Sequence, residues 1–320
     1  VVKLDDLYNR AKENQWNAGD LDWDTPIDPS DPLALSLGHY YAAVPAWKKL
    51  SDRQRETLTA HTTAAYLSQF LHGEQGALAV AAMLTHSLPD MKAKYFAATQ
   101  TADEARHVEA YDRYIQKIAI HYPMAPWLKA LIELILQSNN ILKVITGMNV
   151  LLEGLALSAL NRMYRQVQEP LLKTLTHCVM RDESRHVSFG HLYLPPALAR
   201  LHADEREDLA QFVFDATNIF LTGQVGSCDS YLAQVLVACE LEAQDFAVGC
   251  GSLACSNKAA EQSQHQFFAE VDLITPPLVK MGLVTPRSKS LFESIGVRIN
   301  ANLANFVAAE ERGLKGDATV

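Results

Sequence analysis

A five-residue pattern that occurs twice constrains this chain more than any other feature. Residues 103–107 and 182–186 both read Asp-Glu-x-Arg-His, and each lies within an apolar stretch. On a helix, residues three apart share a face, so each motif directs a glutamate and a histidine to one side. A carboxylate and an imidazole that point together into a buried interior form half of a metal site, because a cation offsets the cost of burying them.

Each motif also follows another glutamate at the same interval. Glu74 and Glu153 lie 30 residues before the glutamates of the first and second motif. Pro89 is 15 residues from both members of the first pair. An antiparallel hairpin that turns there brings the two carboxylates to one height, because each helix rises about 1.5 Å per residue. The second pair fits less evenly around Pro170, at 17 and 13 residues. A single Glu-x-x-His is usually a solvated pair, but two copies with matched partners predict a two-metal site.

The rest of the chain favours an all-helical fold. Its 320 residues include only 15 glycines and 13 prolines, fewer than strands joined by tight turns need. Apolar residues recur at helical spacing in four stretches of the first two thirds. The predicted helices are 51–86 with Ser51 as its cap, 91–121, 127–167 with a break at 138–140, and 171–193 ended by Pro195 and Pro196.

We divide the chain into three parts. Residues 1–50 are expected to form an N-terminal arm, since the first 35 are rich in turn formers and short of helical period. Residues 51–196 are expected to form the four-helix core with the metal site. Residues 197–320 are expected to add supporting helices to the same domain, without site chemistry and with a surface available for a homodimer. The further helices are predicted at 203–224, 231–248, 256–271 and 288–311.

Charge and cysteine content exclude several classes of protein. The net charge of −9 argues against nucleic acid or an anionic membrane as the main partner, since both favour a basic surface. The five cysteines form no CxxC pair, and the spacing of Cys239, Cys250 and Cys255 matches no iron–sulfur motif. An odd number of cysteines fits a reducing compartment. We find no signal peptide and no uninterrupted apolar run of about 20 residues, so the sequence predicts a cytoplasmic protein.

The paired motifs resemble those of the ferritin-like di-metal carboxylate superfamily over roughly residues 55–195. They are most similar to the hydroxylase subunits of bacterial multicomponent monooxygenases, followed by ribonucleotide reductase small subunits and related ligand-binding oxidases. The resemblance implies an all-α, ferritin-like four-helix bundle with additional C-terminal helices. It also implies that one metal is held by Glu74, Glu104 and His107, and the other by Glu153, Glu183 and His186.

The resemblance extends to residues beside the ligands. Asp103 and Asp182 match aspartates that hydrogen-bond the free ring nitrogen of the opposite ligand histidine and fix its tautomer. Arg106 and Arg185 would compensate the charge of the buried acidic cluster. Carboxylate and imidazole ligands without thiolates suit iron or manganese better than structural zinc. The implied cofactor is two iron ions, with a manganese–iron pair as the alternative, and dioxygen is the co-substrate.

The chain departs from its relatives at two positions. Leu157 occupies the place of a threonine found in the monooxygenase hydroxylases. Val179 occupies the place of an additional ligand histidine in the p-aminobenzoate N-oxygenase group, which has the same fold and oxidises aromatic amines. His177 and His191 are therefore interpreted as core or supporting histidines rather than ligands.

Three functions follow from these observations. The leading hypothesis is a non-haem di-iron oxygenase that hydroxylates or N-oxygenates a small organic substrate, with electrons from an external reductase or ferredoxin. The first alternative is a tyrosyl-radical or ligand-binding oxidase. Tyr111, one turn after His107, keeps it open because it matches the radical tyrosine of ribonucleotide reductase; otherwise Tyr111 is a packed core residue. The second alternative is an iron-storage or peroxidase protein, although such chains are shorter.

Overall fold

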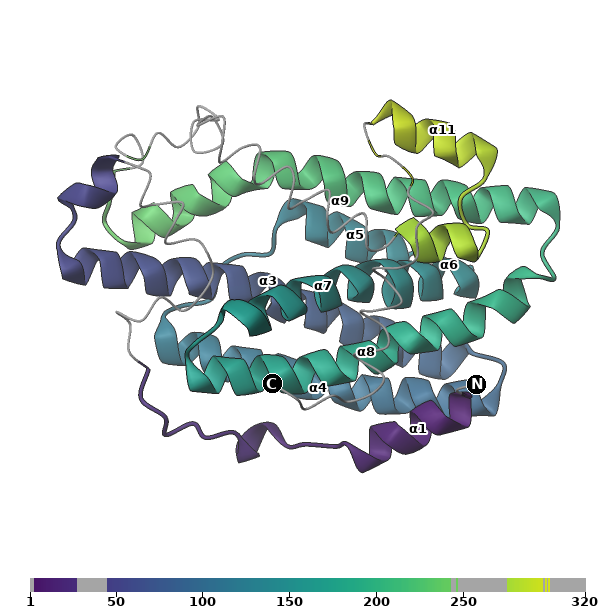
Figure 1. Cartoon of the computed structure of the whole chain (residues 1–320), viewed down its shortest axis with the longest axis horizontal. Helices are drawn as coiled ribbons and strands as arrows, with labels where there is room; N and C mark the ends of the chain where they lie inside the picture. Colours follow the sequence, from purple (N-terminus) through teal and green to yellow (C-terminus); the bar gives the residue numbers. More distant parts are fainter. Residues whose placement is uncertain are drawn as a thin grey trace.

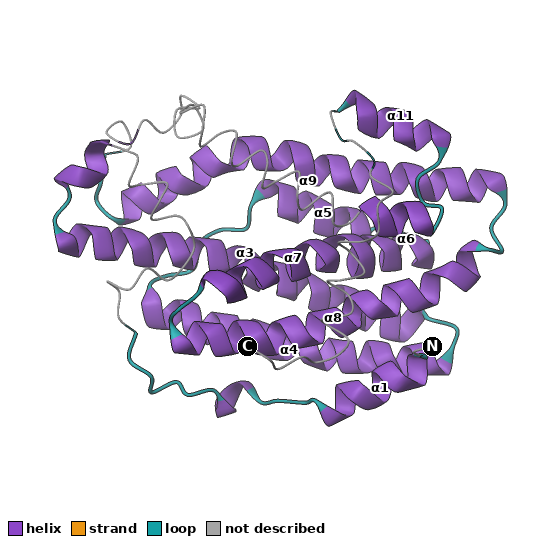
Figure 2. Ribbon diagram, in the orientation of Figure 1, coloured by secondary structure: helices purple, strands orange, loops and turns teal. Residues whose placement is uncertain are grey.

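A computed structural model describes residues 3–27, 45–242, 246, 275–295, 297 and 299; of these, the side chains of 45 and 224–232 are left out. Throughout those residues the chain forms helices and loops, with no strand (Figure 2). The all-α prediction is therefore confirmed. The division into an arm, a core and a supporting part stays a prediction.

Four long helical segments form the bundle (Figure 1). The first two, α3 and α4, pack as an antiparallel hairpin, the last two pack on each other in the same way, and α4 also contacts α8. The third segment is one continuous helix made of α6, the π-helical η3 and α7. The bounds are α3 Asp52–Ser87, α4 Met91–Ile118, α6 Ile141–Ile145, η3 Thr146–Leu152, α7 Glu153–Gln166 and α8 Pro170–Leu198.

Short polar side chains start the bundle helices where the sequence predicts. The Ser51 hydroxyl accepts from the backbone N–H of Gln54, and the Gln54 side-chain oxygen accepts from the backbone N–H of Ser51. These two bonds form a capping box at the start of α3. Asp90 caps α4 and Glu169 caps α8, each accepting from two backbone N–H groups. These caps satisfy donors that the first turn of a helix leaves free. The caps at Asp90 and Glu169 lie at the two hairpin turns, which bring the ligand glutamates of each hairpin to the same height.

The third predicted helix is broken as expected, but the fourth is longer than predicted. Helix α5 (Pro126–Leu136) ends before a short loop, and Asn140 caps the helix that follows. Helix α8 continues through Pro195 and Pro196 to Leu198, so the predicted end at residue 193 is wrong. Proline removes a helix hydrogen bond and crowds the carbonyl four residues back. Here both prolines are exposed and lie in the last turn, where this cost is small.

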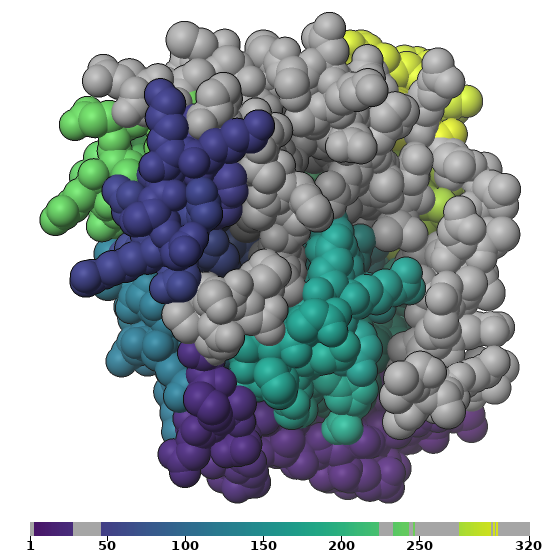
Figure 3. Space-filling model, turned by 60° about the vertical axis from the view of Figure 1, so that its left-hand side comes forward, coloured from purple at the N-terminus to yellow at the C-terminus, as the bar shows by residue number. Residues whose placement is uncertain are grey.

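A helix also forms in the stretch that the sequence analysis described as an arm without helical period. Helix α1 (Leu4–Glu13) packs across α4 and α8, with Leu7 and Ala11 fully buried. A 3₁₀ turn, η1 (Ala18–Asp20), follows it. In the space-filling view this purple segment runs along the edge of the molecule beside the teal bundle helices (Figure 3). The turn formers after residue 20 hid the short apolar repeat of α1.

Further helices cover the other side of the bundle. Helix α9 (Ala203–Ala238) packs on α5 and α3, and it runs unbroken through the predicted gap at 225–230. Its Gly223 permits a close approach to Trp127, since a Cβ there would lie 2.1 Å from the Cβ of Trp127. The glycine therefore serves packing, not helix termination. Helix α11 (Pro286–Ser294) follows; the predicted helix at 256–271, together with Cys250 and Cys255, lies outside the described residues.

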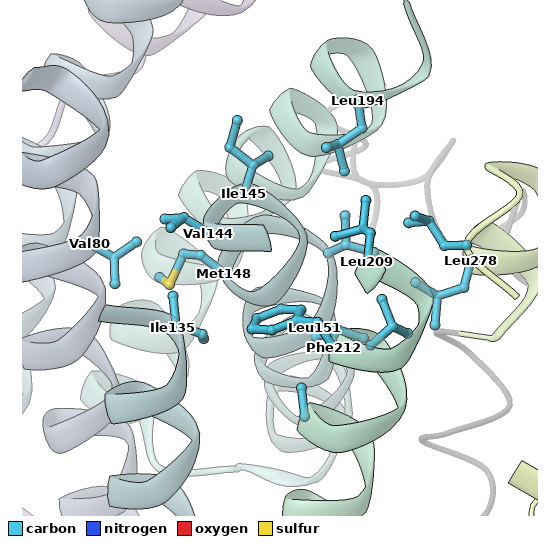
Figure 4. Close-up of a cluster of buried hydrophobic side chains, with 14 of the residues drawn as sticks. Val80, Ile135, Val144, Ile145, Met148, Leu151, Leu194, Leu209, Phe212 and Leu278 are labelled. Carbon is cyan, nitrogen blue, oxygen red and sulfur yellow. The ribbon is translucent and has the colours of Figure 1, made fainter. Parts of the chain in front are cut away.

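The π-helical segment is anchored by an apolar cluster on its outer side (Figure 4). Met148 and Leu151 of η3 meet side chains from α3, α5, α8 and α9, including Val80, Ile135 and Phe212. The continuous helix over 141–166 is long and apolar enough to cross a membrane, yet 56% of its most apolar window is buried in the protein. Since this helix carries Glu153 into the bundle, its apolar character fits a core helix.

Candidate metal centre

The six side chains predicted as ligands meet at one level inside the bundle. None is more than 5% exposed. Each bundle segment contributes: α3 one glutamate, α4 a glutamate and a histidine, α7 one glutamate, and α8 a glutamate and a histidine. In that order the residues are Glu74, Glu104, His107, Glu153, Glu183 and His186.

His107 faces three of the carboxylates. Its Nδ1 lies 3.2 Å from Glu74 Oε2, 3.2 Å from Glu104 Oε2 and 3.4 Å from Glu183 Oε1. All these donor atoms lie within 4.8 Å of one another. Four oxygen and nitrogen donors this close together could form part of the coordination sphere of one cation.

His186 faces a second, overlapping set. Its Nδ1 lies 3.3 Å from Glu104 Oε1, 3.5 Å from Glu183 Oε1 and 3.7 Å from Glu153 Oε1. Glu104 and Glu183 therefore lie between the two histidines. Glu104 belongs to both donor groups, whereas Glu183 belongs to the first and lies 3.5 Å from His186.

The donor atoms fit two divalent cations. Glu104 Oε2, Glu183 Oε1 and His186 Nδ1 are buried, and none has a hydrogen-bond partner among the described residues. Buried polar atoms are normally paired, so these three indicate a missing partner that accepts lone pairs. Four carboxylates carry four negative charges, which two divalent cations neutralise. The donor set contains no thiolate and suits iron or manganese.

The two aspartates of the motifs lie crosswise behind the histidines. His107 Nε2 donates to Asp182 Oδ2 at 3.1 Å, and His186 Nε2 donates to Asp103 Oδ2 at 3.2 Å. Each aspartate thus comes from the motif of the other histidine. With the proton fixed on Nε2, Nδ1 keeps its lone pair toward the carboxylates, as a metal ligand requires.

Two arginines link the aspartates. Arg106 pairs with Asp103 of its own motif and with Asp182 at 3.1 Å. Arg185 contacts Asp182 at 2.5 Å and Asp103 at 3.4 Å. Two guanidinium groups therefore face two buried carboxylates. This arrangement balances the charge of the aspartates without using the cations of the centre.

The charges of the centre shift the protonation of its members. Burial raises the pKa of Glu74 and of Glu153 well above the usual range. Burial alone would lower the pKa of His107, but the charge of Glu74 and the hydrogen bond to Asp182 raise it well above its ordinary value. Burial alone would raise the pKa of Glu104, yet the neighbouring His186 and His107 hold it below the ordinary glutamate pKa. Cation binding is therefore expected to release protons.

The N-terminal segment contributes a residue that the sequence analysis missed. The indole N–H of Trp16 donates to Asp182 Oδ2 at 2.7 Å, and its ring stacks on His107 with ring centroids 6.2 Å apart. Arg106 lies over the other part of the ring, 5.1 Å from its centroid. A surface hollow of about 550 Å³ opens here, lined by Gln15, Trp16, Asp20, Ala102, Arg106 and Glu109. No local pattern connects Trp16 to a motif more than 80 residues away.

Two buried amides were also missed, although a simple spacing rule finds them. Gln100 Nε2 donates to Glu153 Oε1 at 2.5 Å and to Glu104 Oε1 at 3.1 Å. Asn149 Nδ2 donates to Glu153 Oε2 at 2.9 Å, to Gln100 Oε1 at 3.2 Å and to the carbonyl of His186 at 3.2 Å. Each amide stands four residues before a ligand glutamate, one helical turn away.

Tyr111 lies beside the centre but outside its donor groups. Its side chain is fully buried, and its hydroxyl has no hydrogen-bond partner among the described residues. The ring lies 5.8 Å from that of Phe70. Burial, followed by the charge of Glu74, raises the pKa of Tyr111 well above its usual value. His177, which stacks on Tyr164, takes no part in either donor group.

Comparisons with known proteins concern the family and the fold of this chain. The sequence profile of the family described as P-aminobenzoate N-oxygenase AurF matches residues 2–238. No curated protein matches the chain significantly. Among solved structures, a variant of an R2-like ligand-binding oxidase with an aerobically reconstituted Mn/Fe cofactor superposes with a TM-score of 0.52 at 18% identity, over 78% of this chain and 87% of the other. A variant with an anaerobically reconstituted Mn/Fe cofactor gives 0.51 at 20% identity, over 77% and 86%.

Proposed function

Because the chain belongs to the P-aminobenzoate N-oxygenase AurF family, we propose that it oxygenates the nitrogen of a small aromatic amine. The family and the fold confirm the prediction of a ferritin-like di-iron oxygenase. The nature of the substrate and the role of each residue go beyond that and are part of the proposal.

One observation carries the proposal: four carboxylates and two histidines share a buried space where three of their atoms have no hydrogen-bond partner among the residues that the structure describes. We propose that these six residues hold the two metal ions. Two iron ions, when bound, supply the binding position and the electrons with which dioxygen is activated. Glu74, Glu183 and His107 would hold one ion and Glu153 and His186 the other, and Glu104 belongs to both donor groups.

The surrounding residues orient the ligands and exclude water from the centre. Asp103 and Asp182 hold the protons of the histidines on Nε2. The burial of all six ligands excludes bulk water, which strengthens their electrostatic effect and limits side reactions. Val179, fully buried, takes the place of the additional histidine of the N-oxygenase group, so six ligands and not seven are proposed here.

Aromatic rings on the Glu74 side support a flat substrate. Tyr66, Phe70 and Tyr111 form a row, with ring centroids 5.3 Å and 5.8 Å apart. Such rings pack well against another aromatic ring. This row lies next to the centre, because Tyr111 is one helical turn after His107 and Phe70 is one turn before Glu74.

Two matched compounds test the proposal. The iron-loaded, reduced protein is mixed with labelled dioxygen and either 4-aminobenzoate or 4-methylbenzoate, which differ mainly in the nitrogen or carbon at one position. We expect labelled oxygen on the nitrogen of the amine and much less on the methyl group, as mass spectrometry would show. Preferential oxidation of the methyl carbon would contradict N-oxygenation while leaving the di-iron oxygenase intact. The metal-free protein is the control.

The partners are also part of the proposal. An external reductase or ferredoxin would supply electrons, and the hollow beside Trp16 supports an approach at this face. From there, hydrogen bonds lead through the Trp16 indole and Asp182 to His107. A homodimer and a cytoplasmic location stay predictions.

The radical or ligand-binding oxidase is the second candidate. One observation favours it: the buried hydroxyl of Tyr111, which has no partner in the described part of the chain, lies one turn beyond His107 on α4. The like fold of the R2-like oxidases is compatible with either function. Paramagnetic resonance after mixing the reduced protein with dioxygen separates the two, since only the radical oxidase gives a tyrosyl signal.

A further inference from the structure

The four glutamates of the centre differ in the residue one turn before each. Two of these residues are amides and two are apolar. In chain order, before Glu74, Glu104, Glu153 and Glu183, they are Phe70, Gln100, Asn149 and Val179. The two ends of the centre therefore face different surroundings, although the two hairpins supply the same kinds of ligand.

At one end, Glu153 is held through both of its oxygens. Oε1 accepts from Gln100 at 2.5 Å and Oε2 accepts from Asn149 at 2.9 Å. Asn149 also donates to the side-chain oxygen of Gln100, so the three groups form a closed triangle. Both amides are fully buried. A carboxylate with a donor on each oxygen, in a site without bulk water, is held in one orientation.

At the other end, Glu74 has no such support. Its Oε2 lies 3.2 Å from His107, and within the described part of the chain no amide donates to it. The nearby hydroxyl of Tyr111 has no partner there. Among the described residues, Glu74 is therefore held by fewer hydrogen bonds than Glu153.

The π-helix places the second amide. Asn149 lies in the middle of η3, and η3 ends immediately before Glu153. π-Helical turns often occur at functional sites. A Cβ at Gly190 of α8 would lie 2.9 Å from the Cβ of Asn149 and 3.1 Å from Val150. The glycine thus lets η3 approach α8 closely enough for Asn149 to donate to the carbonyl of His186 as well.

From these contacts we infer that Gln100 and Asn149 are positioning residues that lock Glu153 and make the two metal positions unequal. The position at Glu153 and His186 is rigid and binds its metal more tightly. The position at Glu74 and His107 is the adaptable one, and Glu74 is the carboxylate that moves. This inference rests on the proposed metal centre and adds to it which half is fixed.

The test is metal binding, not turnover. Metal-free protein is titrated with Mn(II) in a calorimeter, with paramagnetic resonance to separate isolated from coupled ions. Wild type should bind two ions in two resolved steps, and His186→Ala should remove the tighter one. Asn149→Leu should weaken the tighter step by about tenfold or more, the usual range for residues that orient ligands, and leave the other step within about threefold.

Two further variants guard against trivial explanations. Asn161→Leu is the matched control. Within the described part of the chain, the Asn161 amide on α7 donates only to the carbonyl of Leu157, so this variant should leave both steps unchanged. Gly190→Ala keeps every polar side chain but pushes η3 away, so it should reproduce the effect of Asn149→Leu even if that variant folds poorly. Equal weakening of both steps, or none, in a wild type that binds two ions would overturn the inference alone. A wild type that binds no metal would overturn the proposed centre itself.

Discussion

The two hairpins of the bundle carry the same ligands on differently built helices. In the first, Glu74 sits inside the uninterrupted helix α3, and a sharp turn capped by Asp90 leads to α4. In the second, Glu153 directly follows the π-helix η3, and the turn before α8 is displaced toward Glu183. The uneven spacing of the second pair in the sequence thus accompanies a local change of helix type. Equal motifs do not imply equal surroundings.

The largest expected effect breaks the symmetry of the ligand set. Glu104 belongs to both donor groups, whereas Glu74 and Glu153 belong to one each. Glu104→Ala should therefore reduce binding at both positions, leaving well under two metals per chain. Glu74→Ala and Glu153→Ala should each lose one. Elemental analysis of the purified proteins measures this. Two tightly bound metals in the Glu104 variant would contradict the proposal that Glu104 serves both positions.

The next prediction compares the two aspartates behind the histidines. Asp103→Asn and Asp182→Asn should each weaken metal binding by about 10–100-fold, because a neutral amide orients the imidazole less well. The loss should be larger for Asp182, which also accepts the indole N–H of Trp16. Competition with a coloured chelator gives both affinities. A smaller loss for Asp182 than for Asp103 would show that Trp16 does not strengthen its half of the centre.

A third prediction concerns the stability of protein from which metal has been removed by a chelator. The raised pKa values of Glu74, Glu153, His107 and His186 all favour protonated forms in the folded state. Such contributions are complete below the unfolded pKa and are lost as pH rises through the folded one. The thermal midpoint of metal-free protein should therefore fall as pH rises above about 6.5, the ordinary histidine value.

The pKa of Asp182 acts in the other direction. Burial alone would raise it, but the hydrogen bond from His107 helps to hold it below its ordinary value. Its contribution is present above the ordinary aspartate pKa and is lost only in strong acid, so it does not cancel the effect near neutral pH. Metal-loaded protein should show little change over the same range, since cations replace the protons. A midpoint of metal-free protein that rises with pH would contradict the protonated centre.

The smallest expected effect is at Tyr111. If the protein is an oxygenase, Tyr111→Phe should keep turnover within about tenfold. The hydroxyl has no partner among the described residues, and a hydrogen bond from it to a substrate would contribute only about 0.5–1.5 kcal/mol. Metal content should not change. Tyr114→Phe, which removes a hydroxyl that donates to Glu169 away from the centre, is the control. A stable tyrosyl radical present in wild type and absent from Tyr111→Phe would favour the radical oxidase instead.

The sequence by itself determined the helical fold and predicted the residues of the proposed centre. Helical spacing places Glu104 with His107, and Glu183 with His186, on common faces. Glu74 and Glu104 are equally far from Pro89 along the chain, so a hairpin that turns there places them at the same height. Caps such as Ser51 also act within a few residues. These features are local or follow from the length of one hairpin, so a sequence expresses them directly.

Tertiary structure decided what the chain places around that centre. The contact of Trp16 with Asp182 spans more than 160 residues, and no spacing rule connects them. The sharing of Glu104 between both histidines depends on how α4 and α8 pack, as does the support of Glu153 by Gln100 from another hairpin. The role of Gly223 in packing also depends on tertiary structure, because Trp127 of α5 lies against it. Local pattern fixes which face a side chain occupies, but only the packing of distant segments fixes what that face meets.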